Sequence, residues 1–425
     1  MKRFPLLLAT VFLSLLAGWA FHQKLLAVAD VTDDRAAAQT ALKNGNFKDA
    51  YDLFKELCLS EQPEGMLVAR DFTNAVICLN RLGRLTEFDD FSEQTVAAHD
   101  NDWRVLRAVA DQLLTVQHWG HRVAGAFERG QRRGGGVVVN SMERDRLRAL
   151  QLYVQAMPLI AAEENKQAAA SFYLSLSSAL LNGRGYEEAW RLQYLSNVAE
   201  LPDYDDGYPR YRHGLGAPVD EEGNPVYHQR VKQWQEAETD GERWRWALDQ
   251  VVENHPAQRF EMLWQFANFC KQQFGVQTMQ QQGFPVRGGM GRGVEAAANP
   301  ADAPKESGPY QLHTLSDTET IARLASGIKR FELPDEFNHI RIFRQIMESE
   351  QGSYRRVAAD QIGYILENRR QFPRAATQWR EIIKQFRPSP DDHVHHQLQQ
   401  IVADWGAIEP VQSLAAGQSV EFGFR

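Results

Sequence analysis

Cysteine is scarce in this sequence of 425 residues, which contains only three. Cys58, Cys78 and Cys270 follow no regular spacing, and an odd number of cysteines does not build a disulfide framework. We therefore expect three buried free thiols, a common state of unpaired cysteine. The alternative is one disulfide bond between Cys58 and Cys78, because these residues fall on neighbouring predicted helices.

The sequence also lacks the motifs of the common catalytic chemistries. It has no Gly-x-Ser-x-Gly motif, no His-Glu-x-x-His motif and no pair of carboxylates framed by predicted strands. The glycine run Gly289–Gly293 lacks the flanking strand and helix, and the Lys and Ser/Thr, of a phosphate-binding loop. Cys58–Gln62 places its glutamine one residue too far from the cysteine for an internal thioester. We expect no catalytic residue, no cofactor and no enzymatic activity.

Two histidine-containing stretches offer metal ligands without completing a closed site. In Asp391–His396, the residues Asp392, His393 and His396 lie within about one turn of a predicted helix, where ligands can share a face. Acidic residues at a helix start also serve as caps and interact favourably with the helix dipole. The stretch His118–His121 is the weaker candidate. We therefore expect no metal site.

A strong excess of either charge is absent as well. The formal net charge is -8, and 24% of the residues are charged. This balance disfavours nucleic acid and anionic lipid as main partners, because both require a basic surface. The acidic runs Glu163–Glu164, Glu187–Glu188 and Asp220–Glu222 are interpreted as solvated faces. In Arg243–Trp246 we expect the tryptophans in the core and the arginines at the surface, with an aromatic patch for a partner as the alternative.

One long apolar run is present, and it lies at the N-terminus. Met1–Arg3 is positively charged, Pro5–Phe21 is almost entirely apolar, and Ala27–Ala29 supplies small residues before Asp30. This order is typical of a secretory signal peptide, here residues 1–29 with cleavage after Ala29. The alternative is an uncleaved membrane anchor, since the run is near the lower length limit for spanning a bilayer. Either way, we expect the protein to be exported to the periplasm or the exterior.

Helical periodicity dominates the remainder of the chain and recurs in paired segments. In Ala38–Pro63, Gly45 allows a tight turn, and a second helix follows whose apolar residues are spaced by three and four. The same offsets recur in Ser171–Pro202 and in Ala358–Pro388, where Ala375 is expected to lie opposite Gly363. Weaker copies fall in Val76–Phe88 and Trp244–Pro256. These patterns predict an all-α fold, specifically a tetratricopeptide-like array of helical hairpins, or α-solenoid.

Changes in composition divide the chain. Residues 30–279 and 309–406 are the two predicted helical repeat regions. Between them, residues 280–308 are rich in Gly, Pro and Gln and read as a flexible linker. Residues 203–227 are rich in Asp, Gly, Pro and Tyr and read as an irregular excursion from the array. Gly134–Gly136 is interpreted as a loop between helices.

The C-terminal residues differ in pattern from the helices before them. Trp405 and Gly406 are expected to close the last helix, and apolar and polar residues then alternate in Ser419–Phe424, as in a strand. A single strand has nothing to pair with here. We therefore interpret residues 407–425 as the start of a truncated β domain and expect almost no strand before Ser413.

Several stretches in the second half of the chain carry a resemblance to a known family. They are Tyr310–Leu315, Glu319–Ala325, Leu333–Asn338, Glu367–Arg370, Gln399–Val402 and Trp405–Gly406. Together they resemble the N-terminal helical region of large exported planctomycete proteins of the alpha-2-macroglobulin type. That resemblance implies tetratricopeptide-like helices that precede macroglobulin β-sandwich domains. This sequence contains no macroglobulin domain, bait segment or working thioester, so no functional residue of the family can be assigned here.

These observations favour a non-catalytic, exported helical scaffold that binds another protein or the macroglobulin-type domains that would follow it. No nucleic-acid partner is expected, and a membrane is involved only if the N-terminal segment is not cleaved. Two alternatives place a site around residues 203–227. One is an enzyme that uses the Tyr, Asp, Arg and His side chains of this segment, and the other is a carbohydrate- or peptidoglycan-binding protein.

Overall fold

The computed structural model describes residues 33–60, 64–185, 188–209, 216–276, 311–350, 352–403, 406–408 and 422–424. The predicted signal peptide (residues 1–29) and the predicted linker (residues 280–308) lie outside these ranges. The described chain is mostly helical, as the all-α prediction requires. It divides into two compact units, each assembled from separate stretches of sequence, and the boundary between them falls within a helix after Gln250.

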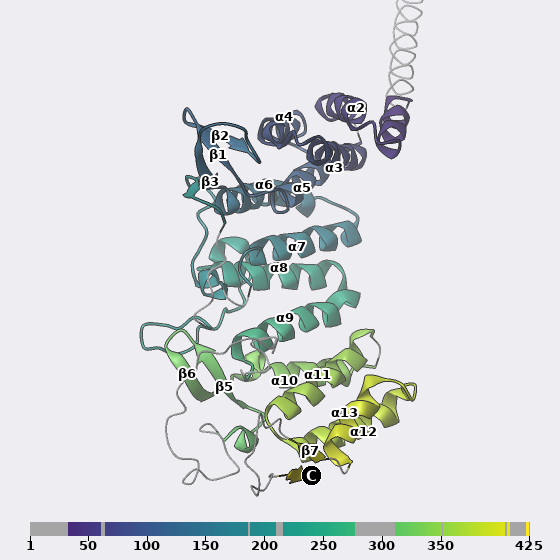
Figure 1. The fold of residues 1–425 in the computed structure, drawn as a ribbon, viewed down its shortest axis with the longest axis vertical. Helices are drawn as coiled ribbons and strands as arrows, with labels where there is room; N and C mark the ends of the chain where they lie inside the picture. Colours follow the sequence, from purple (N-terminus) through teal and green to yellow (C-terminus); the bar gives the residue numbers. More distant parts are fainter. Residues whose placement is uncertain are drawn as a thin grey trace, which may run out of the picture. The chain divides into compact units, whose positions relative to one another are not determined.

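Unit 1 contains the chain up to Asn182 together with Leu195–Tyr211 and Gln233–Gln250. Its helices are the segment at residues 33–43, α2 (Phe47–Leu59), α3 (Gly65–Leu82), η1 (Leu85–Glu87), α4 (Phe88–Ala98), α5 (Trp103–Leu113), α6 (Met142–Ala161), α7 (Lys166–Leu181), η3 (Trp234–Glu236) and the first part of α8 (Asp240–Asn254) (Figure 1).

The first two helix pairs of unit 1 turn where the sequence supplies a glycine. Gly45 and Gly83 have φ angles of 78° and 66°, in the left-handed region that glycine adopts without strain. The amide after each glycine donates back into the preceding helix, from Asn46 to Ala41 and from Arg84 to Leu79. The helix-turn-helix patterns predicted in Ala38–Pro63 and Val76–Phe88 are therefore confirmed as local structure.

A small antiparallel sheet is formed by three strands between α5 and α6 and a fourth strand that follows α7. Its strands are β1 (Trp119–Val123), β2 (Ala126–Arg129), β3 (Val137–Asn140) and β4 (Asp205–Asp206), in the order β2-β1-β3-β4 (Figure 1). Ala124 and Gly125 both have positive φ, as in the tight two-residue turns that match the twist of a hairpin. The expectation of almost no strand before Ser413 was therefore wrong, and Gly134–Gly136 joins two strands, not two helices.

Unit 2 contains Gly183–Tyr194, Arg212–Lys232 and the chain from Val251 onward. Its helices are η2 (Ala189–Gln193), η4 (Pro256–Gln258), α9 (Arg259–Phe274), η6 (Leu312–Thr314), η7 (Asp335–Phe337), α10 (His339–Met347), α11 (Tyr354–Asn368), α12 (Phe372–Phe386) and α13 (His393–Val402). Strands β5 (Glu319–Leu324) and β6 (Gly327–Glu332) form an antiparallel hairpin, which the sequence reading also missed.

The two other strong repeat copies had different outcomes. In Ala358–Pro388, α11 and α12 form the predicted helix pair. The ring of Trp379 faces Gly363, and Ala375 is fully buried one turn earlier in α12. In Ser171–Pro202 the predicted second helix does not form, and the short 3-10 helix η2 takes its place.

The strand predicted near the C-terminus is present and has a partner. Strand β8 (Phe422–Phe424) pairs antiparallel with β7 (Gly406–Ile408), and the residues between them lie outside the described ranges. The expectation that a terminal strand would have nothing to pair with was therefore wrong. Gly406 belongs to β7 and does not close α13, which ends at Val402.

Candidate functional site

Unit 1 contains an open groove with a volume of about 400 Å³. Helices α3, α5 and α7 line it, and these are alternate helices along the chain. We refer to it as the α3–α5–α7 groove. Concave sites lined by a few polar groups among apolar ones are the usual places where proteins bind ligands or partner segments.

The three helices lie side by side because their ends meet. A side chain at Gly65, the first residue of α3, would overlap Asp102, which caps the start of α5 by accepting from the Arg104 amide. At the start of α7, Glu163 accepts hydrogen bonds from Trp103 Nε1 at 3.0 Å and from Arg104 Nη2 at 2.7 Å.

At the other end of the groove, the Asn182 amide after α7 donates to the Leu114 carbonyl after α5 at 3.4 Å. Helices α5 and α7 are therefore joined start to start and end to end. The three helices run in one direction along the groove.

Small residues make the groove hollow. Each of the three helices contributes an alanine to its lining, namely Ala69, Ala108 and Ala168. Beside them, Met66 lines the groove with 69% of its surface exposed. An exposed large apolar side chain in a groove is a feature of binding surfaces more than of folding cores.

The charges that line the groove are mostly positive. Arg70, Arg104 and Arg107 face one acidic residue, Asp111. Arg104 pairs with Glu163 at 2.7 Å and lies over the Trp103 ring, 4.4 Å from its centroid.

The other two arginines differ in how far they are neutralised. Arg107 lies 3.5 Å from Asp111 and donates to the Ser171 hydroxyl. Arg70 is exposed and forms no ion pair or side-chain hydrogen bond with the described residues.

Asp111 is held firmly from beneath the groove. Tyr153 donates its hydroxyl to the Asp111 carboxylate, and Tyr153 itself is fully buried. Burial raises the pKa of Asp111, against the hydrogen bond from Tyr153 and the charge of Arg107, which lower it. Nearby, the side chain of Gln112 also lines the groove and makes no hydrogen bond with the described residues. The groove is thus lined by guanidinium and amide groups.

A second polar site of unit 1 is a buried ion network that attaches the sheet to the helices. Arg129 at the end of β2 is 1% exposed and binds both oxygens of Asp145 in α6, at 2.8 and 2.9 Å. It also binds both oxygens of Asp89 in α4, at 3.1 and 2.6 Å. His118 Nδ1 lies 2.9 Å from Asp145 Oδ2, and Ser141 donates to the same oxygen at 2.7 Å.

This network fixes structure. Burial alone would raise the pKa of Asp145, but the hydrogen bonds from His118 and Arg129 outweigh it and hold the pKa below its usual value. The Arg129 guanidinium uses all three of its nitrogens on these partners, so its donors are directed inward. We interpret the cluster as the anchor of β2 on α4 and α6. From the sequence, His118 was predicted only as part of a weak metal candidate.

The Arg243–Trp246 run was only partly interpreted correctly. Both tryptophans are buried, as expected, but Arg243 and Arg245 are buried too, at 7% and 3% exposure. Arg243 donates to the Ser196 carbonyl at 3.0 Å and stacks on the Trp234 ring, 4.5 Å from its centroid. The expectation of surface arginines was therefore wrong, and for Arg243 the cause is the residues Ser196 and Trp234 that cover it.

The histidine-rich stretch Asp391–His396 follows the capping interpretation. Asp392 caps α13 by accepting from the Val394 amide, and it also binds Arg356 at 2.9 Å. His393 stacks against the Tyr364 ring, while His396 contacts Gln400 on the surface. Within the described ranges, no three His, Cys, Asp or Glu side chains are grouped to hold a metal ion.

The segment 203–227 does not belong to one unit. Residues 203–209 are in unit 1, where Tyr204 stacks on Phe127 and Asp203 binds Arg122 at 3.1 Å. Residues 216–227 are in unit 2, where Asp220 accepts from the Asn224 amide in an exposed turn. Residues 210–215 lie outside the described ranges.

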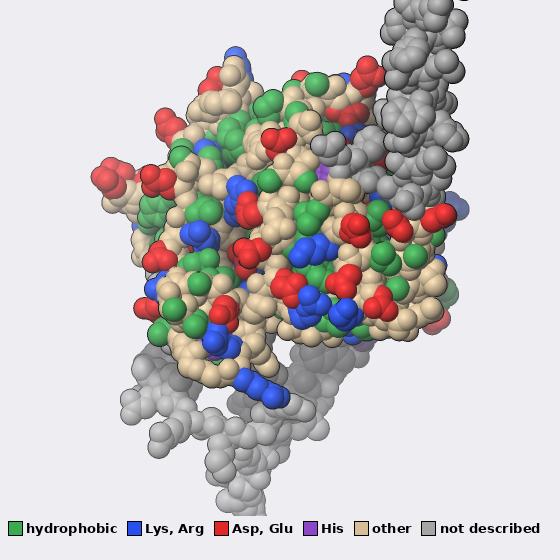
Figure 2. All heavy atoms as spheres, turned by 90° about the horizontal axis from the view of Figure 1, so that it is seen from above, with side chains coloured by type: hydrophobic (Ala, Val, Ile, Leu, Met, Phe, Trp, Pro, Cys, Tyr) green, Lys and Arg blue, Asp and Glu red, His purple; other side chains and the backbone are tan. Residues whose placement is uncertain are grey.

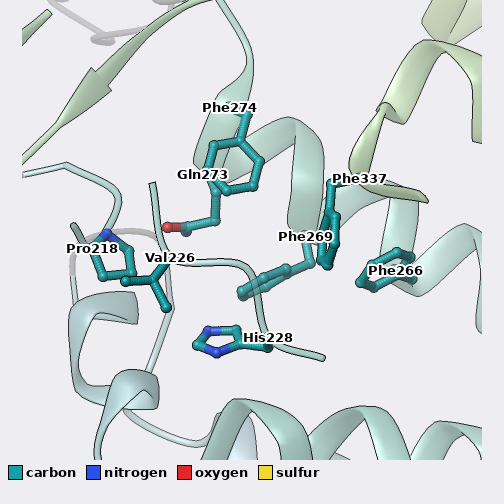
Figure 3. Close-up of a pocket in the computed structure, with 8 residues that line it drawn as sticks. All are labelled: Pro218, Val226, His228, Phe266, Phe269, Gln273, Phe274 and Phe337. Carbon is teal, nitrogen blue, oxygen red and sulfur yellow. The ribbon is translucent and has the colours of Figure 1, made fainter. Parts of the chain in front are cut away.

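Unit 2 contains a small cavity among aromatic side chains (Figure 3). Its volume of about 10 Å³ has room for about one water molecule. Figure 3 shows the amide of Gln273 pointing toward Val226 and Pro218. The side chain of Gln273 is buried without a hydrogen-bond partner among the described residues.

The three cysteines are free and buried, which confirms the first of the two interpretations. Burial raises the pKa of the Cys58 and Cys78 thiols, which keeps both in the unreactive thiol form. Cys58 lies near the end of α2, with its sulfur 3.9 Å from the Val68 carbonyl.

No described helix is long and apolar enough to cross a bilayer.

Comparison with known proteins returned no match, whether to family models, to curated proteins or to solved structures.

Proposed function

We propose that this chain is a non-catalytic helical scaffold that binds a segment of a partner protein in the α3–α5–α7 groove. The observation that carries the proposal is the groove itself, which three parallel helices line with small, cationic and amide side chains. A groove of this kind suits an extended chain, because alanines let its backbone approach and amides can bond its peptide groups.

The order of the helices supports a repeat array of the tetratricopeptide-like kind. In unit 1, α3, α5 and α7 line the groove, while α4 and α6, which alternate with them along the chain, contribute nothing to it. Stacked helix pairs of a solenoid leave one helix of each pair on the binding face in this way. We propose that the sheet β1–β4 and the irregular segment after α7 are insertions into such an array.

Export and a link to macroglobulin-type proteins complete the proposal. They rest on the sequence of residues 1–29 and on the resemblance described above. We propose a periplasmic or extracellular location, with macroglobulin-type domains as the alternative occupants of the binding surface. Mass spectrometry of the secreted protein checks the first point, since a chain that begins at Asp30 is expected and a retained N-terminal segment contradicts cleavage.

The distribution of surface charge also favours a protein partner. On the face shown in Figure 2, acidic and basic side chains are interspersed and do not gather in one basic region. Nucleic-acid-binding faces instead concentrate lysine and arginine. This mixed face and the net charge of -8 both favour a protein partner over nucleic acid.

Selection from a random peptide display library on the purified chain tests the groove. Ala108→Trp fills the groove and should abolish binding of the selected peptides, because the indole takes the space of the occupant. Ala97→Trp is the matched control, since Ala97 is an exposed residue of α4 outside the groove. If no peptide is enriched, or if both variants bind equally, the groove is not the binding site.

Carbohydrate binding is the second candidate, and one observation favours it. Trp119 on β1 and Tyr208 pack edge to face with their ring centroids 5.1 Å apart, and Tyr208 is 56% exposed. Exposed aromatic rings can stack against sugar rings. Sedimentation with insoluble peptidoglycan should then depend on Tyr208, and identical sedimentation of the Tyr208→Ala variant contradicts this function.

A further inference from the structure

We infer that the α3–α5–α7 groove selects an acidic segment, with one carboxylate of the segment paired to Arg70 and an apolar side chain beside Met66. This inference rests on the proposed function and names the chemistry of the occupant.

The first step is the sign of the charge in the groove. Three arginines and one aspartate line it, while the whole chain carries a net charge of -8. The groove is thus a positive site on a negative protein. Complementary charge steers association and disfavours partners of the wrong sign. We therefore expect the groove to bind an anionic peptide segment more tightly than a basic or neutral one.

The second step is to identify the arginine that can pair with a carboxylate of the occupant. Glu163 already neutralises Arg104, and Asp111 lies next to Arg107. Arg70 is different, because it is exposed and has no ion pair among the described residues. A guanidinium offers two parallel N–H groups to a carboxylate, and such bidentate pairs fix geometry as well as adding affinity.

The third step concerns the direction of the helices. The starts of α3, α5 and α7 meet at one end of the groove, near Trp103 and Asn165. Helix starts carry partial positive charge. At this end Asp102 and Glu163 already accept hydrogen bonds from the backbone amides of Arg104 and Asn165, and Glu163 also pairs with Arg104. The anchor for a carboxylate of the occupant is therefore Arg70, one turn along α3 from Met66.

The fourth step is the apolar contact that distinguishes a peptide from a simple anion. Met66 lies one turn before Arg70 on α3, and both line the groove. Methionine is flexible and adapts to varied apolar partners. An occupant that meets both residues carries an acidic and an apolar side chain close together in sequence, as in an extended stretch that alternates Glu and Leu.

Fluorescence anisotropy with three labelled peptides of equal length tests the inference on the full chain. The first alternates Glu and Leu, the second replaces each Glu by Gln, and the third replaces each Glu by Lys. We expect the Glu peptide to bind at least about tenfold more tightly than the Gln peptide, with a preference that weakens as salt is added. The Lys peptide should not bind.

Two charge reversals on one helix localise the effect. Arg70→Glu should reduce binding of the Glu peptide at least about tenfold, because it places a repelling carboxylate at the anchor. Arg81→Glu is the matched control, since it makes the same charge change at an exposed position of α3 outside the groove, and it should change binding less than about twofold. Thermal melts should show that both variants remain folded.

The outcomes separate this inference from the proposed function. If the Gln peptide binds as tightly as the Glu peptide and Ala108→Trp still abolishes binding, the groove binds peptides without acidic selection and the inference is overturned. If heparin competes as well as the Glu peptide and is equally sensitive to Arg70→Glu, the site takes any polyanion and the inference is again overturned. If neither these peptides nor the display library binds, the proposed function fails as well.

Discussion

The contact between Gly363 and Trp379 makes Gly363→Ala the most informative single change in unit 2. A Cβ atom at position 363 would lie 2.5 Å from two carbons of the Trp379 ring. Carbon atoms pack favourably at about 3.5–4.0 Å, so ring and helix must separate by about 1 Å or more. Trp379 has little freedom to move, because it is fully buried and its Nε1 donates to Glu367 at 2.6 Å.

Two opposing effects set the change in the free energy of unfolding that Gly363→Ala causes. Gly→Ala in a helix interior normally stabilises by about 1 kcal/mol, because alanine has less backbone freedom to lose. Overpacking a buried site costs about 1–3 kcal/mol, and expelling a tryptophan from its site costs about 3–5 kcal/mol. We therefore expect Gly363→Ala to lower the free energy of unfolding by about 1–3 kcal/mol overall, with the sign opposite to that of helix propensity.

Hydrogen exchange measured by mass spectrometry on peptides from α11 and α12 gives the local free energy of opening. Gly185→Ala serves as the control, because no atom lies within 4 Å of its added Cβ, and it should change stability by less than about 0.5 kcal/mol. In a background with the smaller Trp379→Phe ring, Gly363→Ala should cost less. Increased protection of α11 in Gly363→Ala, or an equal cost in both backgrounds, would refute the packing argument.

Three further predictions concern other buried or exposed groups. Burial and the charges of neighbouring cations lower the pKa of His339 from 6.5 to about 3, so the folded state resists the protonation that the unfolded chain accepts. Stability should therefore fall by about 1.4 kcal/mol per pH unit below about pH 6, and urea titrations at several pH values should show a flatter dependence for His339→Gln. Ala375→Trp should unfold the α11–α12 pair in thermal melts, while His396→Ala should stay within about 0.5 kcal/mol and show no zinc-dependent shift. Arg129→Leu should cost about 3–5 kcal/mol in unit 1, because it leaves the buried Asp145 and the partly exposed Asp89 without their cation, and an unchanged melting temperature would contradict the anchoring role.

The features that were predicted correctly are those encoded over short stretches of sequence. The α11–α12 pair and the turn at Gly45 follow from apolar residues spaced by three and four, and from a glycine where the chain reverses. The β1–β4 sheet was missed because its strands are only two to five residues long. Segments that short carry too little alternation to be distinguished from a loop.

The buried ion network could not be inferred from any local pattern. Arg129 meets Asp89 and Asp145, which are 40 and 16 residues away along the chain. A pair of this kind is invisible until the elements are packed, because a lone arginine in a sequence reads as a surface residue. The buried Arg243 and Arg245 were misread for the same reason.

The sequence by itself determined the helical class, the reduced and buried state of the cysteines, and the position of several turns, because these depend on composition and on contacts within one or two helical turns. Only the tertiary structure decided which residues line the α3–α5–α7 groove. Met66, Trp103 and Ala168 belong to three separate helices, and each reads in the sequence as an ordinary member of an apolar stripe. They become one groove because the close contact at Gly65 and the bonds to Glu163 bring the starts of those helices together.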